Sequence, residues 1–303
     1  MQHLTIFLLI SVAVLACVSL SGCGDEKGDS QTDTENKYEP RVCVLGYESG
    51  GCWDLEVLVN GIPVICGKKG GGTIPVSYLV VDGKNHVQIT AELIKEDFFK
   101  TPLKVQMFWP SNHHIASRDT IFQLEEEYGD IGQKVSKDFS FDVALPFTRK
   151  WQASPQISHL SDQDREDILS EIGKVCVALK EKNVDQYLEL TDVAVKDAAQ
   201  YRNVDSDIIT GEIRERYGTL FSNSAYAPVM REEENIQIEP CGSVVLVTGK
   251  RDNDDIWKTA VIRLIYTRET FSETSHKSTT IGLKRFGFSK IDGKWRIVIV
   301  DGY

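Results

Sequence analysis

Three short segments carry side chains with the chemistry to bind a metal ion or a phosphate group. The adjacent residues His113 and His114 have no cysteine or carboxylate at ligand spacing around them, so we interpret them as an exposed loop. The acidic run 252–255 lacks the glycine and the distal glutamate of a calcium-binding loop. The glycine-rich run 67–72 lacks the Gly-Lys-Ser/Thr order of a phosphate-binding loop. We therefore predict no metal site and no cofactor.

The N-terminus has the pattern of an export signal. Residues 4–20 are apolar and uncharged, and they lead into Leu20-Ser21-Gly22-Cys23. A run of this length followed by small residues indicates a signal peptide and its cleavage site. The four residues resemble the lipobox of bacterial lipoproteins, which implies that residues 1–22 are removed and that Cys23 carries a lipid such as palmitate. A plain transmembrane anchor is the alternative, because about 20 apolar residues can span a bilayer.

The segment after the lipobox is polar. Residues 23–37 contain almost no apolar side chains, so we expect a flexible tether between the anchor and the folded chain. Gly24 follows Cys23, which resembles outer-membrane lipoproteins and implies a location facing the periplasm or the cell surface. The net charge of −11 argues against binding to nucleic acid or to an anionic membrane surface. We expect a membrane attachment through the lipid and a protein partner.

Five cysteines follow the lipobox, and export makes disulfides possible for them. Cys43 and Cys52 flank the short run 46–51, so we predict a disulfide between them. A second possible pair is Cys176 with Cys241. We expect Cys66 to be a buried free thiol, because it shares the inward face of a hairpin.

That hairpin belongs to a region of short strands, residues 38–147. Leu55, Val57 and Val59 alternate with polar residues, and Asn60-Gly61 supplies a tight turn. Such a turn places Leu55 opposite Cys66. Further strands are expected at 74–81, 86–93, 103–109, 120–124 and 139–145. We predict an all-β N-terminal domain, an antiparallel sandwich.

Residues 148–160 lack periodicity and are expected to be a linker, after which the pattern becomes helical. Ser161 is a suitable N-cap with Asp164 three residues later. Three helices are expected, one up to Asn183, one at about 185–200 and one following Asp207. From residue 236 onward only strands are expected, at 236–239, 243–249, 257–266, 281–291 and 295–300, the last two joined by Asp292-Gly293.

Three helices followed by strands, ending in Phe288-Ser-Lys-Ile-Asp-Gly-Lys-Trp295, resemble the nuclear-transport-factor-like superfamily, which includes ketosteroid isomerase and SnoaL-like proteins. The resemblance covers residues 161–303 and implies an α+β C-terminal domain, in which helices pack on a curved antiparallel sheet around a conical pocket. Isomerases of this superfamily use an acidic base with a tyrosine or a protonated acid. Residues of types that could serve in this way are Tyr187, Asp192, Tyr201, Tyr217 and Asp301, and we take Tyr187, Asp192, Tyr217 and Asp301 as the candidate pocket residues.

None of these residues lies in a matching family motif, and the sequence has no Gly-x-Ser-x-Gly nucleophile motif. We therefore predict a non-catalytic envelope lipoprotein that binds another protein, for example as an immunity or accessory lipoprotein. Two alternatives stay open. The C-terminal pocket could bind or isomerise a small apolar ligand, or the chain could be a structural scaffold in an envelope complex.

Overall fold

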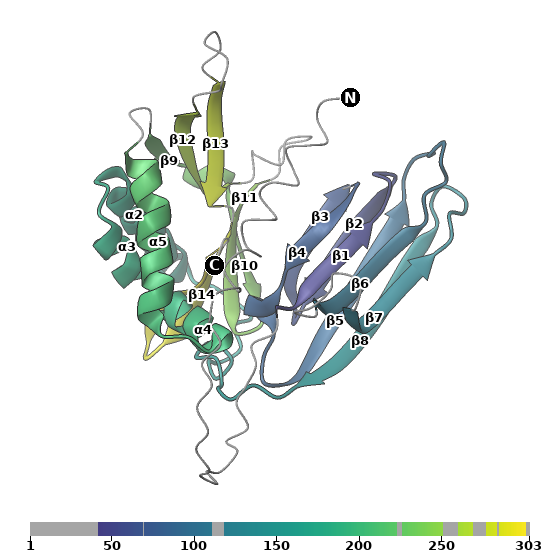
Figure 1. Ribbon diagram of the computed structural model, residues 1–303, viewed down its shortest axis with the longest axis horizontal. Helices are drawn as coiled ribbons and strands as arrows, with labels where there is room; N and C mark the ends of the chain where they lie inside the picture. The colour runs from purple at the N-terminus through teal and green to yellow at the C-terminus, as the bar shows by residue number, and fades with distance from the viewer. Residues whose placement is uncertain are drawn as a thin grey trace, which may run out of the picture. The chain divides into compact units, whose positions relative to one another are not determined.

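The computed structural model describes residues 42–68, 70–110, 118–222, 226–250, 260–268, 277–283 and 285–300. Within these ranges the chain forms a β-rich mixed fold, with three antiparallel four-stranded sheets, one three-stranded sheet and four α-helices (Figure 1). The expectation of an antiparallel β-rich chain with helices in its second half is confirmed at this level.

Two of the four-stranded sheets are built from residues before 144. One has the order β4-β1-β6-β7, and the other has the order β3-β2-β5-β8 (Figure 1). Their bounds are β1 Val44–Glu48, β2 Trp53–Val59, β3 Ile62–Lys68, β4 Gly71–Pro75, β5 Gly83–Leu93, β6 Leu103–Pro110, β7 Arg118–Glu126 and β8 Lys134–Val143. Both sheets contribute side chains to one hydrophobic core, as in a β-sandwich.

The alternation in β2 explains how its sheet closes over this core. Leu55, Val57 and Val59 are buried, whereas Asp54 and Glu56 on the other face are exposed. Asn60 and Gly61 both have positive φ, at 52° and 78°, as a two-residue hairpin turn requires. The predicted hairpin between β2 and β3 is therefore confirmed at its turn.

The inward position predicted for Cys66 is wrong, because β3 contains a β-bulge. Val59 pairs with Ile62 as expected, but the register shifts at Val64, so that Val57 pairs with Ile65. One extra residue in a strand moves every later side chain to the opposite face. Cys66 consequently pairs with Glu56 rather than with Leu55, and it is exposed.

The strand expected at 74–81 is also corrected. β4 ends at Pro75, and a short 3-10 helix, η1, occupies Ser77–Leu79. Proline has no N–H for a further ladder hydrogen bond, which favours an end of pairing at this point. The buried apolar residues Val76, Leu79 and Val80 still join the core of the two sheets. The sequence therefore predicted the burial of these side chains correctly but not the backbone conformation.

The second half begins with helices. Their bounds are α2 Asp162–Lys180, α3 Val184–Leu190, α4 Asp192–Arg202 and α5 Ser206–Phe221. Ser161 caps α2 in a reciprocal capping box with Asp164, as the sequence predicts. The second expected helix is instead two helices, because the chain departs from helical geometry at Thr191, whose hydroxyl donates to the carbonyl oxygen of Tyr187.

The C-terminal strands form two sheets among the described residues. One has the order β10-β11-β14-β15, and the other has the order β13-β12-β9. Their bounds are β9 Ala227–Met230, β10 Ile236–Cys241, β11 Val244–Gly249, β12 Ile262–Arg268, β13 Lys277–Leu283, β14 Arg285–Ile291 and β15 Lys294–Val300, with a 3-10 helix, η2, at Glu233–Asn235. The single strand expected at 281–291 is thus the end of β13 and all of β14. The turn at Asp292-Gly293 is confirmed, with φ of 51° and 75°.

The sheet β10-β11-β14-β15 is buried on both faces at β11. Val245 and Val247 belong to the core that contains the helices, whereas Val244 and Leu246 belong to the core of the first two sheets. A direct hydrogen bond also links the two halves, from Arg285 to the carbonyl oxygen of Pro63. The apolar run in β11 therefore reflects a strand that packs on both sides.

Candidate functional site

Two of the pocket residues implied by the resemblance lie next to each other in the helical core. The rings of Tyr187 in α3 and Tyr217 in α5 have their centroids 4.8 Å apart, and both residues are buried. Burial raises the pKa of Tyr217, and its hydrogen bond with Tyr187 opposes that rise. Both tyrosines are therefore packed side chains of the helical core, and Tyr217 stays protonated at neutral pH.

The acidic candidate among the described residues does not join them. Asp192 is at the start of α4, where its carboxylate pairs with Lys196 at 3.0 Å on the surface. Asp301 lies outside the described residues. The structure thus brings together two of the four predicted pocket residues and places the described acid elsewhere. Tyr201, the remaining residue of the appropriate type, is a buried residue of α4 whose ring faces the Arg149 guanidinium.

The disulfide predicted between Cys43 and Cys52 is absent, and both are buried free thiols. The two cysteines are separated by β1, which at about 3.3 Å per residue spans roughly 16 Å. A disulfide needs Cα atoms within about 7 Å of each other. Flanking a short run suggested proximity, but the first half of that run belongs to the extended strand β1, and Cys52 follows the turn after it.

The second possible disulfide is absent for a related reason. Cys176 is buried in the helical core, whereas Cys241 packs against the core of the first two sheets. In β10, Ile236 and Ile238 face the helices, so Cys241, at an odd spacing from both, points to the opposite face. Burial is the main cause that raises the pKa of Cys241, to about 11.

Several predicted features lie outside the described residues. These are the signal peptide, the lipobox with Cys23, the tether, His113-His114 and the acidic run 252–255. Within the ranges that the structure describes, no helix is long and apolar enough to cross a membrane. Within the same ranges, no three histidine, cysteine or acidic side chains group around a common metal position.

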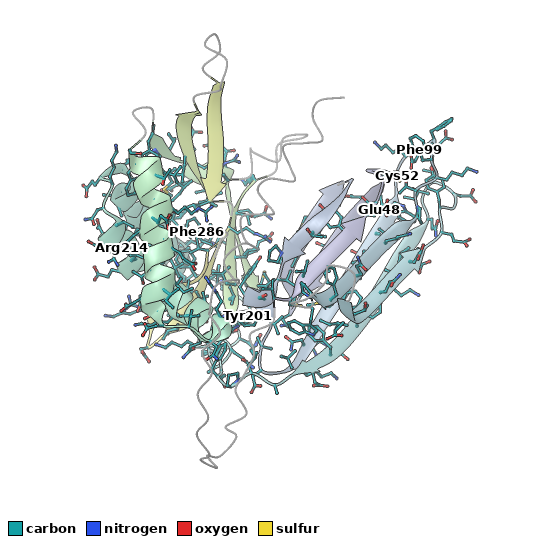
Figure 2. The ribbon with its side chains drawn as sticks, in the orientation of Figure 1. Glu48, Cys52, Phe99, Tyr201, Arg214 and Phe286 are labelled. Atoms are coloured by element: carbon teal, nitrogen blue, oxygen red, sulfur yellow. The ribbon has the colours of Figure 1, made fainter. Side chains whose placement is uncertain are left out.

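An exposed apolar surface lies in the loop that joins β5 to β6 and in the loop that joins β7 to β8. Phe98 and Phe99 are 94% and 82% exposed, and their rings pack edge to face with centroids 5.3 Å apart. Ile131, in the neighbouring loop, is 58% exposed. We call Phe98, Phe99 and Ile131 the apolar tip. Figure 2 shows Phe99 beyond Cys52 and Glu48 at the outer end of the strands, pointing away from them.

The loop that carries the two phenylalanines is held by hydrogen bonds. The Asp97 carboxylate accepts from the Thr101 hydroxyl at 2.5 Å and from the Thr101 amide at 2.9 Å. The Asp97 amide donates to the Tyr128 hydroxyl at 2.8 Å, which connects this loop to the loop of Ile131. Hydrogen bonds from Thr101 are the largest cause that lowers the pKa of Asp97. The rings of Phe98 and Phe99 are therefore presented to solvent by a turn whose backbone is held by hydrogen bonds.

A second candidate site surrounds a buried ion pair. Arg149 is 2% exposed, and it donates to the carbonyl oxygens of Val80 at 2.8 Å and Ser77 at 2.9 Å. Its Nη1 lies 3.8 Å from Oδ2 of Asp197, which is 4% exposed. Burial raises the pKa of Asp197 to about 6, with the charge of Arg149 opposing the rise. A strongly perturbed carboxyl beside a specific charge is a recognised mark of a functional site.

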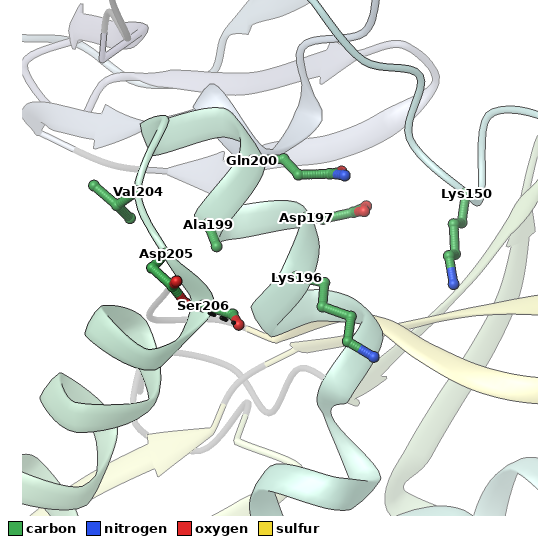
Figure 3. Close-up of a pocket in the computed structure, with 8 residues that line it drawn as sticks. All are labelled: Lys150, Lys196, Asp197, Ala199, Gln200, Val204, Asp205 and Ser206. Atoms are coloured by element: carbon green, nitrogen blue, oxygen red, sulfur yellow. Dashed lines mark hydrogen bonds between the residues drawn. The ribbon is translucent and has the colours of Figure 1, made fainter.

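Asp197 lines a cavity of about 340 Å³ beside α4, together with Lys150, Lys196, Ala199, Gln200, Val204, Asp205 and Ser206. In Figure 3 the side chains of Asp197 and Gln200 extend from α4 toward the segment that carries Lys150. This volume is at the lower end of the range for small-molecule sites, roughly 300–1,000 Å³. The cavity combines carboxyl, ammonium and amide groups, so its chemistry is polar.

No family model matches this chain, and no curated protein matches it either. The resemblances to lipoproteins and to the nuclear-transport-factor-like superfamily therefore stay predictions. The functional interpretation has to come from the geometry of the two sites.

Sequence reasoning missed both sites. The pair Phe98-Phe99 follows three charged residues in a run without strand alternation, and that context was the available sign that the rings are exposed. Arg149 lies in the expected linker, and Asp197 lies on a helix whose acidic residues looked equivalent. The tertiary packing of α4 distinguishes buried Asp197 from partly exposed Asp192.

Proposed function

We propose that this chain is a non-catalytic lipoprotein of the bacterial cell envelope that binds another protein through the apolar tip. The observation that carries the proposal is the near-complete exposure of Phe98 and Phe99 on a turn fixed by Asp97. Isolated exposed apolar residues are ordinary, but here two aromatic rings contact each other on a loop that is hydrogen-bonded to the loop of Ile131.

Energetics favour such a patch as a docking element. A phenylalanine buries about 150–250 Å² when a partner covers it, and aromatic side chains are enriched among the residues that dominate binding energy. The turn around Asp97 and Thr101 already holds the rings in place, so little conformational entropy is lost when the partner binds. The tip thus has the chemistry and the rigidity of a preformed interface.

The sequence supports the location. Leu20-Ser21-Gly22-Cys23 resembles a lipobox, and the polar residues 24–37 suit a flexible tether to the membrane. In this proposal a β-sandwich domain, residues 38–147, carries the tip, residues 148–160 join the domains, and a SnoaL-like domain follows at 161–303. The burial of Tyr187 and Tyr217 and the surface position of Asp192 support a non-catalytic second half.

A photocrosslinking experiment tests the docking role. A benzophenone amino acid replaces Phe98 in one variant and Ile208, an exposed apolar residue of α5, in a matched control. We expect a discrete protein adduct after irradiation of cells with the first variant only, and we expect the adduct to disappear when Phe99 is also changed to Ser. Equal adducts at both positions, or none at either, would contradict the proposal.

A second experiment tests the anchor independently. Metabolic labelling with a palmitate analogue should mark the wild-type chain, and Cys23→Ala should abolish the label and impair processing. Unchanged labelling of Cys23→Ala would show that the lipid assignment is wrong, and it would leave the docking result to stand by itself.

A further inference from the structure

The cavity beside α4 contains a carboxyl group whose hydrogen-bonding capacity is not met by the protein. Oδ2 of Asp197 is enclosed and has no hydrogen-bond partner. Its nearest cationic contact, Nη1 of Arg149, is 3.8 Å away, which is beyond hydrogen-bonding distance. A buried ionised carboxylate is costly unless donors surround it, so this position favours a ligand that brings a charged donor.

Arg149 does not fill that role, because its guanidinium is directed elsewhere. Nε and Nη2 donate to the carbonyl oxygens of Val80 and Ser77, and the group lies over the ring of Tyr201 at 5.3 Å. These contacts hold Arg149 against η1. The guanidinium therefore neutralises Asp197 at a distance, and it leaves the carboxyl available to a closer donor.

Other residues that line the cavity are positively charged and favour a negatively charged group. Lys150 and Lys196 both line it, and the charge of Lys150 acts on Asp197. Lys196 has a surface pair with Asp192, of the kind that contributes little because both partners are solvated. Two ammonium groups in the lining attract an anionic group, and Gln200 adds an amide donor and acceptor beside Asp197 (Figure 3).

From this arrangement we infer that the cavity binds a small zwitterion, whose ammonium group meets Asp197 and whose anionic group meets Lys150 and Lys196. Amino acids and other amino-substituted carboxylates form this chemical class. The volume of about 340 Å³ limits the ligand to a small molecule. The site is separate from the apolar tip, so the inference goes beyond the proposed docking function and does not depend on it.

Calorimetric titration of the mature, lipid-anchored chain in detergent micelles tests the inference. The probes are glycine, β-alanine, γ-aminobutyrate and ε-aminohexanoate, which separate the two charges by increasing lengths. Butyrate and butylamine serve as controls that each lack one charge. We expect one or two neighbouring lengths to bind with a Kd in the millimolar range or tighter, and we expect neither control to bind.

Variants link the binding to the named groups. Lys150→Gln changes an exposed side chain and should weaken the best probe about tenfold, and Asp197→Asn should weaken it by roughly ten- to a hundredfold. Lys174→Gln removes a surface lysine of α2 that pairs with Glu171, and it should leave the Kd unchanged.

The following results would overturn the inference that the cavity binds a zwitterion. Absence of binding by all four zwitterions overturns the inference. Butylamine or butyrate binding as well as the zwitterion overturns it in favour of a simple cation or anion site. If Asp197→Asn fails to fold, Lys150→Gln decides, and an unchanged Kd in that variant overturns the assignment to this cavity.

Discussion

Nη1 of Arg285 donates a hydrogen bond of 2.7 Å to the carbonyl oxygen of Pro63, although 222 positions separate the two residues in the chain. Pro63 precedes the bulge in the edge strand β3, and Arg285 begins β14. The bond therefore joins the sheet β3-β2-β5-β8 to the sheet β10-β11-β14-β15 through a charged donor. Hydrogen bonds with a charged partner stabilise folded proteins by about 1.5–3 kcal/mol.

We expect Arg285→Gln to lower the free energy of unfolding by about 1.5–3 kcal/mol, because the carbonyl oxygen of Pro63 loses its donor in a partly buried place. Urea denaturation monitored by tryptophan fluorescence measures this change. Arg214→Gln is the matched control, since Arg214 pairs with Asp185 on the surface and should contribute less than about 1 kcal/mol. Equal effects of the two variants would show that the Pro63 contact adds nothing.

Asp197 should make stability depend on pH. Its pKa is raised from the usual value of 3.8 to about 6 in the folded chain, mainly by burial, so the folded state holds its proton more tightly than the unfolded state. A raised pKa stabilises the fold fully below about pH 4, and this contribution is lost as the pH rises through about 6. The difference amounts to about 3 kcal/mol.

Asp197→Asn should remove that pH dependence, because asparagine does not titrate. The measurement is the free energy of unfolding at several pH values from 4 to 8, in both the wild type and the variant. We expect the difference between the two curves to change between pH 4 and 6.5 and to be flat above it. Parallel curves over the whole range would refute the burial of an ionisable group at this position.

Two glycines should respond in opposite ways to the same substitution. At Gly50, φ is +57° and an added Cβ would lie 2.7 Å from Cβ of Thr101, so Gly50→Ala should destabilise the chain by about 1–3 kcal/mol and disturb the apolar tip. Gly211, inside α5, has open space around it, so Gly211→Ala should stabilise by about 0.5–1 kcal/mol. Thermal unfolding of both variants checks the signs.

The cysteines should differ in reactivity. Cys66 is exposed, whereas Cys43, Cys52 and Cys176 are buried. Burial also raises the pKa of Cys241 to about 11, which leaves little thiolate there at neutral pH. Brief treatment of the native chain with a maleimide, followed by peptide mapping, should therefore label Cys66 first among these five. Preferential labelling of Cys176 would show that the helical core opens readily.

Local signals were the part of the fold that the sequence predicted well. Asn60-Gly61 and Asp292-Gly293 adopt the positive φ values that their residue types favour, and Ser161 caps α2. Each feature depends on a few neighbouring residues. The bulge at Val64 was missed because it depends on how β3 pairs with β2. The helix break at Thr191 was missed although the bond of its hydroxyl to the carbonyl oxygen of Tyr187 is local.

The same distinction explains the candidate sites. Cys43 and Cys52 are close in sequence but stand at the two ends of an extended strand, which spacing alone did not reveal. Arg149 and Asp197 are 48 positions apart, so no motif signals their contact, and their burial depends on the packing of η1 against α4. Pairs formed by tertiary packing require the three-dimensional arrangement.

The extra residue in β3 also bears on how this chain behaves when many copies are crowded together. β3 is the outer strand of its sheet, and such a strand exposes backbone groups that another chain can pair with. Pro63 has no N–H to offer, Val64 interrupts the ladder, and Arg285 occupies the carbonyl oxygen of Pro63. One half of this edge is thereby closed to strand addition, which protects densely displayed copies from aggregating through β3.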